Sequence, residues 1–225
     1  MTTAGLIAKK IGMTRMVDGE GQMTAVTLLQ VETQKVTKIL SEERDGYVGF
    51  QVGYFAKKEK HLNKPDLGRL RKVNIQENYS RFKEFRLDAV PADLALGAPL
   101  EFGKFFEGVT SVDVTGITKG LGFMGAHVRW GAAVGRRSHG ARAGRQPGSL
   151  GMRTTPGRVF KGKHQPGQEG NTQTTVQNLQ VLDVDQANNV VAVRGSVPGH
   201  RDGFLILKPS IKAKALKQPA AAPKK

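Results

Sequence analysis

The chain has 225 residues, with 35 lysine and arginine residues against 19 aspartate and glutamate residues, a formal net charge of +16 and no cysteine. The length allows one ordinary domain with additions, and the charge indicates an anionic partner without identifying the anion. The lack of cysteine excludes disulfides, thiolate catalysis and zinc knuckles. The sequence has no long apolar run, and residues 1–16 show no signal or transit pattern. We therefore expect a cytoplasmic protein without a membrane partner.

Short segments rich in β-branched and apolar residues dominate the first part of the chain and predict strands. In one of these segments, Val109–Ile117, the residues Val112 and Val114 alternate with polar neighbours, as in a half-buried strand. The segments are Leu6–Ile11, Met23–Val31, Val36–Leu40, Tyr47–Tyr54 and Val109–Ile117. The polar stretch Ser41–Gly46 is expected to be a loop.

A charged insertion of mixed α/β character, residues 56–95, interrupts these strands. We expect short helical stretches around Lys57–Leu62. Because proline and glycine disfavour helix interiors, Pro65 and Gly68 are expected to break them.

The most unusual stretch runs from Val114 to Gln168, which is 55 residues without one aspartate or glutamate. It holds 13 of the 28 glycines and ten cations, of which seven are arginines. The cations are Lys119, Arg129, Arg136, Arg137, Arg142, Arg145, Arg153, Arg158, Lys161 and Lys163. Unopposed charge repels itself and glycine resists ordering, so we expect residues from about 119 to 170 to be mobile without a polyanion. Because arginine grips phosphate with a planar fork of donors and stacks on bases, a structured nucleic acid is the favoured partner.

The sequence returns to a β pattern after the basic segment. Val176–Val184 and Val190–Arg194 flank a turn at Asp185–Asn189 and predict a hairpin, and Phe204–Lys208 predicts a last strand. Several short strands at this spacing favour a mainly β fold with a small closed β-barrel, whose strands come from both sides of the basic segment.

These patterns predict the domain organisation. We expect a single β-barrel domain over residues 1–211, which includes the insertion and a long basic, glycine-rich extension at residues 119–170. Residues 212–225 contain five lysines among alanine, proline and glutamine, and are expected to form a disordered basic tail.

Three glycines, Gly120, Gly122 and Gly125, form a GxGxxG motif after a predicted strand. In a dinucleotide-binding fold this motif opens a helix, and an acidic residue about 20 positions later holds the ribose. The next acidic residue here is Glu169, so we expect no cofactor and assign the glycines to close approach between backbone and RNA.

Catalysis and metal binding are not indicated either. Ser138 and His139 could suggest a nucleophile beside a base, but the side chains of adjacent residues rarely point at each other. The nearby sequence also has no carboxylate to orient the imidazole. His127, His139 and His164 lie among cations, which disfavours a divalent metal. We expect that the protein is not an enzyme and binds no metal and no small-molecule substrate. We expect the histidines to contact phosphate or base.

Trp130, the one tryptophan, follows Arg129 and allows two interpretations. It can pack locally with Phe123, Met124 and Val128, or its ring can stack on RNA or fill an RNA cavity. The two arrangements can coexist, so both stay open.

Several blocks of sequence, taken together and in their order along the chain, form a specific pattern. They are Gly5-Leu6-Ile7-Ala8-Lys9-Lys10-Ile11-Gly12-Met13-Thr14, then Asp113-Val114-Thr115-Gly116-Ile117-Thr118-Lys119-Gly120 running to Arg129-Trp130, Ser138-His139-Gly140, Pro147-Gly148-Ser149-Leu150-Gly151 and Thr155-Pro156-Gly157-Arg158-Val159-Phe160-Lys161-Gly162-Lys163. Lys64-Pro65 with Gly68 and Val197-Pro198-Gly199 add to them. From about Gly5 to Lys212 the chain resembles the universal ribosomal protein L3 family of the large subunit, bacterial type.

The resemblance implies a translation-protein-like barrel on the subunit surface and an extension that threads through 23S ribosomal RNA towards the peptidyl transferase centre. It also implies early binding that helps to nucleate subunit assembly, neighbouring large-subunit proteins as partners, and a cytoplasmic location in the large subunit. We expect Arg129 and Trp130 at the tip of a loop that positions RNA without performing chemistry. The residues expected to bind rRNA are Lys9, Lys10, Lys119, Arg129, Trp130, Arg136, Arg137, His139, Arg142, Arg145, Arg153, Arg158, Lys161 and Lys163.

Two other functions remain open on the sequence. Composition alone also fits a free-standing basic protein that binds nucleic acid or acts as a chaperone, and co-sedimentation with large subunits separates that alternative. An enzyme is the third option, although no motif meets the geometric requirements of a catalytic site.

Overall fold

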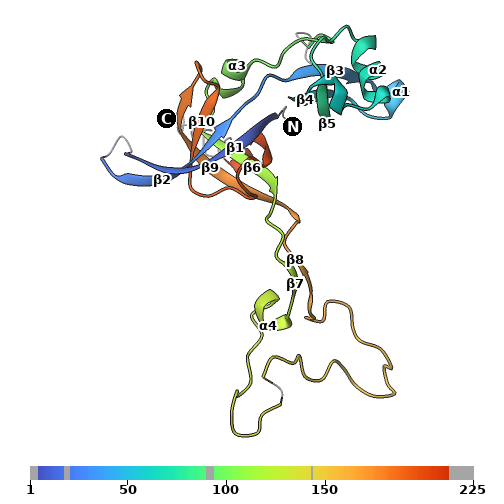
Figure 1. Cartoon of the computed structure of the whole chain (residues 1–225), viewed down its shortest axis with the longest axis vertical. Helices are drawn as coiled ribbons and strands as arrows, with labels where there is room; N and C mark the ends of the chain where they lie inside the picture. Colours follow the sequence, from blue (N-terminus) through green and yellow to red (C-terminus); the bar gives the residue numbers. More distant parts are fainter. Residues whose placement is uncertain (1–4, 18–20, 90–93, 143, 213–225) are drawn as a thin grey trace, which may run out of the picture. The chain divides into compact units, whose positions relative to one another are not determined.

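The computed structural model describes residues 5–17, 21–89, 94–142 and 144–212 and divides the chain into two compact units (Figure 1). Unit 1 comprises Met1–Ile117 and Thr174–Lys225, and unit 2 comprises Thr118–Gln173. Unit 2 covers the segment for which the sequence predicts a basic extension. The predicted tail lies outside the described residues except for Lys212, as do residues 90–93 of the insertion.

Six strands close into a barrel in the order β1-β11-β6-β9-β10-β2. They are β1 (Leu6–Val17), β2 (Met23–Gln30), β6 (Ser111–Ile117), β9 (Gln173–Asp185), β10 (Val190–Arg194) and β11 (Phe204–Pro209). Strand β1 pairs with β2 and β11, β10 pairs with β2 and β9, and β11 pairs with β6, all antiparallel. Strands on both sides of unit 2 in the sequence therefore share one sheet, and the predicted mainly β class is confirmed.

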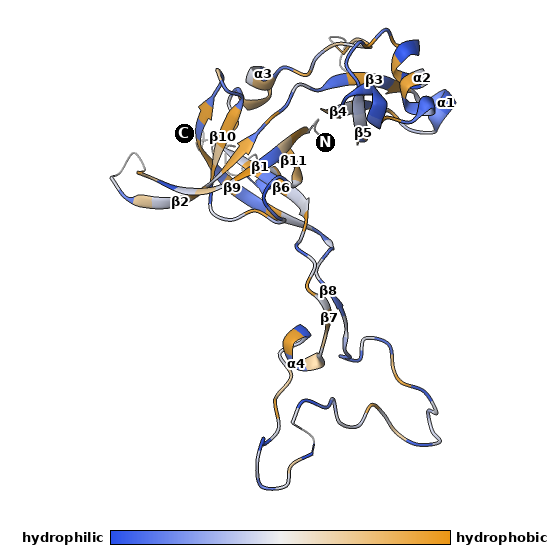
Figure 2. Ribbon diagram, viewed as in Figure 1, coloured by the Kyte–Doolittle hydropathy of each residue, from blue (hydrophilic) through white to orange (hydrophobic). Residues whose placement is uncertain are grey.

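Side chains of the barrel strands alternate between two hydrophobic clusters. Leu6 on β1 and Leu207 on β11 belong to one cluster of buried residues, which we call the barrel cluster. Ile7 belongs to a second cluster, and Ile206 packs against it. Figure 2 shows hydrophobic and hydrophilic residues interspersed along these strands. Since successive side chains point to opposite faces, a slip of one residue would exchange the two sets, and this fixes the register. The short helix α3 (Phe102–Phe106), which the sequence did not predict, packs its phenylalanines against the barrel cluster.

The second cluster lies under a separate three-stranded sheet in the order β3-β4-β5. Its strands are β3 (Lys35–Leu40), β4 (Gly49–Ala56) and β5 (Tyr79–Arg86). The first two match predicted strands, whereas β5 lies in the insertion, where the sequence pattern predicts no strand. The stretch predicted as a loop between β3 and β4 contains one helical turn, α1 (Glu42–Asp45), which ends at Gly46 in the left-handed conformation.

The insertion also contains a 3-10 turn, η1 (Glu59–His61), and the helix α2 (Lys64–Lys72). The predicted break at Pro65 is wrong, because this proline lies in the first turn of α2, where no intrahelical N–H bond is lost. Gly68 is likewise inside the helix. In the part of the chain that the structure describes, no helix is both long and apolar enough to cross a membrane.

A buried glutamine joins the start of the second sheet to the barrel. The Gln34 side chain donates from Nε2 to the carbonyl oxygen of Ile7 at 2.6 Å and accepts at Oε1 from the Ile7 N–H at 3.1 Å. Gln34 is 1% exposed, so these bonds satisfy polar groups that water does not reach. The side chain thus substitutes for a neighbouring strand beside β1.

Candidate nucleic-acid interface

Unit 2 begins and ends in a short antiparallel ladder. Strand β7 (Gly122–Met124) pairs with β8 (Gly167–Glu169), and the N–H of Thr118 donates to the carbonyl oxygen of Thr172 at 2.9 Å. Gly170 has a φ of +70°, and a Cβ there would overlap the facing backbone, so the ladder requires glycine at this position. The two ends of unit 2 are therefore held side by side.

The GxGxxG glycines form part of this ladder. Gly122 starts β7 with a φ of +77°, and Gly125 precedes a helix of only four residues, α4 (Ala126–Arg129). A dinucleotide fold instead places its motif between a buried strand and a long helix. From residue 130 to residue 166, the described residues form no helix or strand.

Unit 2 has almost no hydrophobic core. Ala126 is the one buried residue among those described in Thr118–Gln173, whereas Phe123 is 77% exposed and Phe160 56% exposed. Without buried apolar surface, little offsets the conformational entropy of ordering the segment. We therefore expect stable order over its whole length to require a partner.

The predicted RNA-binding cations of unit 2 face solvent. Nine of the ten are exposed, and only Arg129 is half-buried. The segment contains one carboxylate, Glu169, which forms an ion pair with Arg129 at 3.6 Å. His139 is also exposed and has a φ of +57°. The remaining nine cations are thus available to an anionic partner.

Arg129 and Trp130 take part in a clamp that joins the end of α4 to the residues before β8. The Trp130 ring stacks on His164, with centroids 4.4 Å apart and an interplanar angle of 3°. Its Nε1 donates to the carbonyl oxygen of Gln165 at 3.0 Å, and Arg129 Nη1 donates to the same oxygen at 3.3 Å. The Arg129 guanidinium also lies over the indole, 5.0 Å from the ring centroid. We call residues 129, 130, 164, 165 and 169 the loop clamp.

The loop clamp corrects one expectation from the sequence. Trp130 is not at the tip of a loop, because it closes the base of the loop formed by residues 131–163. The indole also has two partners that neither interpretation of Trp130 included, since it stacks on His164 and donates a hydrogen bond to Gln165. No local pattern could reveal these partners, because they lie about 35 positions away in the sequence. The one feature of the sequence that points to these contacts is Glu169, the single carboxylate of unit 2.

The loop clamp can be tested through the fluorescence of the single tryptophan. In the chain with His164→Ala, we expect the emission of Trp130 to shift to longer wavelength and its quenching by acrylamide to increase. The reason is that one face of the indole becomes exposed and a stack worth about 0.5–1.5 kcal/mol is lost. His139→Ala, at an exposed position within the loop, is the matched control. If both variants give the emission and quenching of the parent chain, the stack is not populated.

The two predicted RNA-binding lysines of unit 1 have intramolecular contacts. Lys9 forms an ion pair with Asp202 at 3.1 Å. Lys10 donates from Nζ to the carbonyl oxygens of Val197 and Gly199, at 3.0 and 3.2 Å. The structure therefore gives Lys10 a role in holding the turn before β11.

The histidines of unit 2 do not converge. His164 belongs to the loop clamp, His139 lies in the exposed loop, and His127 is half-buried with Nδ1 lacking a hydrogen bond to any described residue. Within the described ranges, no three His, Cys, Asp or Glu side chains are grouped so that they could hold a metal ion. The arrangement of unit 2 suits binding of a polyanion.

Comparison with known proteins gives a consistent result. The family model described as ribosomal protein L3 matches residues 91–189, which include all of unit 2. The chain is 42% identical to large ribosomal subunit protein uL3 of Alkaliphilus metalliredigens over 208 residues, covering 92% of this chain and 98% of the relative. It is 41% identical to the uL3 protein of Thioalkalivibrio sulfidiphilus over 212 residues, or 93% and 98% of the two chains. The uL3 protein of Bordetella pertussis is 41% identical over 215 residues, or 95% and 92%.

The similarity extends over nearly the full length of both partners in each comparison, and therefore includes the barrel, the insertion and unit 2. It confirms the resemblance that the ordered sequence blocks indicate. This chain belongs to the ribosomal protein L3 family.

Proposed function

We propose that this chain binds 23S rRNA through unit 2 and so anchors itself in the large ribosomal subunit. As a member of a family of ribosomal proteins, it is a structural constituent of the large subunit in the cytoplasm and not an enzyme. Its partners are accordingly ribosomal RNA and other subunit proteins. The observation that supports the finer proposal is the exposure of nine cations on a unit with one carboxylate and, among its described residues, one buried residue.

Phosphate contacts supply what unit 2 lacks by itself. Each lysine or arginine that meets a phosphate releases condensed counterions and removes repulsion from its neighbours. The seven arginines can also bind phosphate with two hydrogen bonds or stack on bases. RNA around unit 2 would therefore stabilise an arrangement that a hydrophobic core does not.

The same physics supports a role in assembly. A segment with little core is ordered only when polyanion surrounds it, so RNA folds around the segment more readily than the segment enters RNA that has already closed. This order of events corresponds to early binding and nucleation of subunit assembly. In this proposal the loop of residues 131–163 extends towards the peptidyl transferase centre and positions RNA there, while the loop clamp holds its base.

The alternative of a free-standing nucleic-acid-binding protein differs in stoichiometry. We expect the tagged chain to sediment with large subunits in a one-to-one ratio after a moderate salt wash, because contacts spread over unit 2 dissociate together only at high salt. The matched control is a chain whose nine exposed unit 2 cations are replaced by glutamine. Recovery of the parent chain mainly in the ribosome-free fraction would favour the free-standing protein.

A further inference from the structure

The positive charge of residues 1–113 is concentrated in the insertion. Residues 57–86 carry ten lysines and arginines against four aspartates and glutamates, a net of +6. The rest of residues 1–113 carries seven against eleven, a net of −4. The nearly neutral total of the first half of the chain therefore conceals a second basic region, separate in sequence from unit 2.

Most of this charge lies on and around α2. Seven exposed cations form what we call the insertion patch, namely Lys57, Lys58, Lys60, Lys64, Arg69, Arg71 and Lys72. Leu70 is buried with Tyr79 of β5 and fixes the inner side of the helix, which leaves its cations on the outside. The Arg69 guanidinium lies over the ring of Phe82, 5.0 Å from the centroid, and so stays extended along the surface.

The carboxylates nearby do not neutralise the insertion patch. Within the segment, Glu59 pairs with Arg71 at 2.8 Å, and Glu77 pairs with Lys35 from outside the patch. Lys58, Lys64 and Lys72 form no ion pair with any other residue that the structure describes. These three lysines are therefore available to an external anion.

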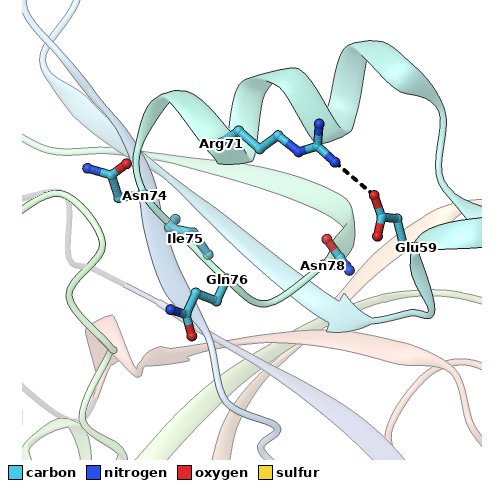
Figure 3. Close-up of a pocket in the computed structure, with 6 residues that line it drawn as sticks. All are labelled: Glu59, Arg71, Asn74, Ile75, Gln76 and Asn78. Carbon is cyan, nitrogen blue, oxygen red and sulfur yellow. Dashed lines mark hydrogen bonds and ion pairs between the residues drawn. The ribbon is translucent and has the colours of Figure 1, made fainter.

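A polar pocket of about 440 Å³ opens beside the insertion patch (Figure 3). Its lining combines Arg71 of α2 and Glu59 of η1, which meet in an ion pair, with residues of the segment between α2 and β5. That segment contributes three amide side chains and one apolar residue: Asn74, Gln76, Asn78 and Ile75. Amides offer both donors and acceptors, which is the combination that reads the edge of a base.

We propose that the insertion patch and this pocket bind a second site on ribosomal RNA, with phosphates on the lysines and one unpaired nucleotide in the pocket. The inference rests on the proposed function, since it takes 23S rRNA as the ligand. Proteins recognise RNA sequence mainly at loops and bulges, where bases leave the stack and expose their hydrogen-bonding edges. A basic surface next to a pocket lined by amides matches such a site.

The pocket also constrains the part of the nucleotide that enters it. The ion pair of Glu59 with Arg71 leaves the pocket without a net positive charge to hold a phosphate, whereas the lysines outside the pocket attract the phosphates on either side. A carboxylate instead accepts hydrogen bonds from exocyclic amino groups, as glutamate does from cytosine. Glu59 therefore favours a base that carries an amino group over uracil.

Binding and footprinting on 23S rRNA test this with the full chain. The patch variant combines Lys58→Gln, Lys64→Gln and Lys72→Gln, and its control combines Arg15→Gln, Arg44→Gln and Arg194→Gln, which removes the same charge from exposed positions elsewhere in unit 1. We expect the patch variant to flatten the log–log salt slope by about two to three units and to lose one discrete cluster of protected nucleotides. Equal thermal melting of the two variants shows that both are folded. The patch variant overturns the proposal if it has the slope and footprint of the control.

A pocket variant separates base recognition from charge. With Gln76→Ala and Asn78→Ala together, we expect loss of protection at one unpaired nucleotide while the salt slope is unchanged. Protection that persists there overturns the pocket assignment. Normal binding of the patch variant to naked rRNA, with poor incorporation when subunit proteins are present, would assign the patch to an acidic protein instead. The proposed function itself fails in a different way, because then the parent chain gives no specific footprint on 23S rRNA.

Discussion

Replacing residues 119–170 with a short glycine–serine link is expected to leave the barrel folded and to weaken binding to 23S rRNA by about a thousandfold or more, which is the usual difference between specific and non-specific binding. The barrel cluster draws all of its buried residues from unit 1. The ends to be joined are already adjacent, because Thr118 and Thr172 share a backbone hydrogen bond of 2.9 Å. Circular dichroism and thermal melting report the fold, and filter binding reports the affinity.

A full-length control separates charge from bulk in this experiment. A chain in which the ten cations of residues 119–170 are replaced by glutamine keeps the backbone of unit 2 but removes its attraction for phosphate. We expect this control to bind nearly as weakly as the shortened chain. Affinity close to that of the parent chain in either variant would place the main RNA contacts in unit 1.

Leu207→Ala is expected to lower the free energy of unfolding of the barrel by about 2–5 kcal/mol, the range for a leucine deleted from a packed core. Leu207 is 0% exposed and lies in the barrel cluster, on the strand that closes the barrel between β1 and β6. Urea unfolding monitored by circular dichroism measures the change.

The control for this substitution is Ile117→Ala at the end of β6. Ile117 is 58% exposed, so its truncation is expected to change the free energy of unfolding by about 0.5 kcal/mol or less. If Leu207→Ala is no more destabilising than Ile117→Ala, the barrel cluster does not hold unit 1 together.

Strands that alternate or that lie next to a clear turn could be predicted from the sequence. Val190–Arg194 matches β10 at both ends, and Phe204–Lys208 stops one residue short of the end of β11. Here local pattern and burial agree, since Val191 and Val193 are 0% exposed and face the barrel cluster. The mainly β class follows from such segments.

Elements of the insertion could not be predicted in the same way. The sequence of strand β5 is rich in charged residues, and only its Tyr79 and Phe85 are buried. It forms a strand because β4 supplies its hydrogen bonds. The sequence pattern predicts a break at Pro65, whereas this proline lies in the first turn of α2. Pairing partners and packing decide both elements, and neither is visible in a short window of sequence.

The candidate site divides along similar lines. Exposed cations such as Arg153 and Arg158 could be predicted from the charge pattern, because the glycine-rich segment around them has too few apolar residues to form a core. The loop clamp could not be predicted, because it depends on the ladder that brings His164 next to Trp130. Composition thus identifies the kind of partner, whereas the geometry that presents the cations depends on contacts between distant residues.

The salt dependence of binding between the full chain and 23S rRNA tests most directly the claim that unit 2 is an electrostatic RNA-binding element. If six to ten cations meet phosphates, the slope of log K against log salt is expected to be roughly −4 to −9. Arg153→Ala together with Arg158→Ala is expected to flatten that slope by about one to two units, while Arg15→Ala with Arg44→Ala in unit 1 leaves it unchanged. A slope near zero for the parent chain, or an unchanged slope after loss of Arg153 and Arg158, would contradict the claim.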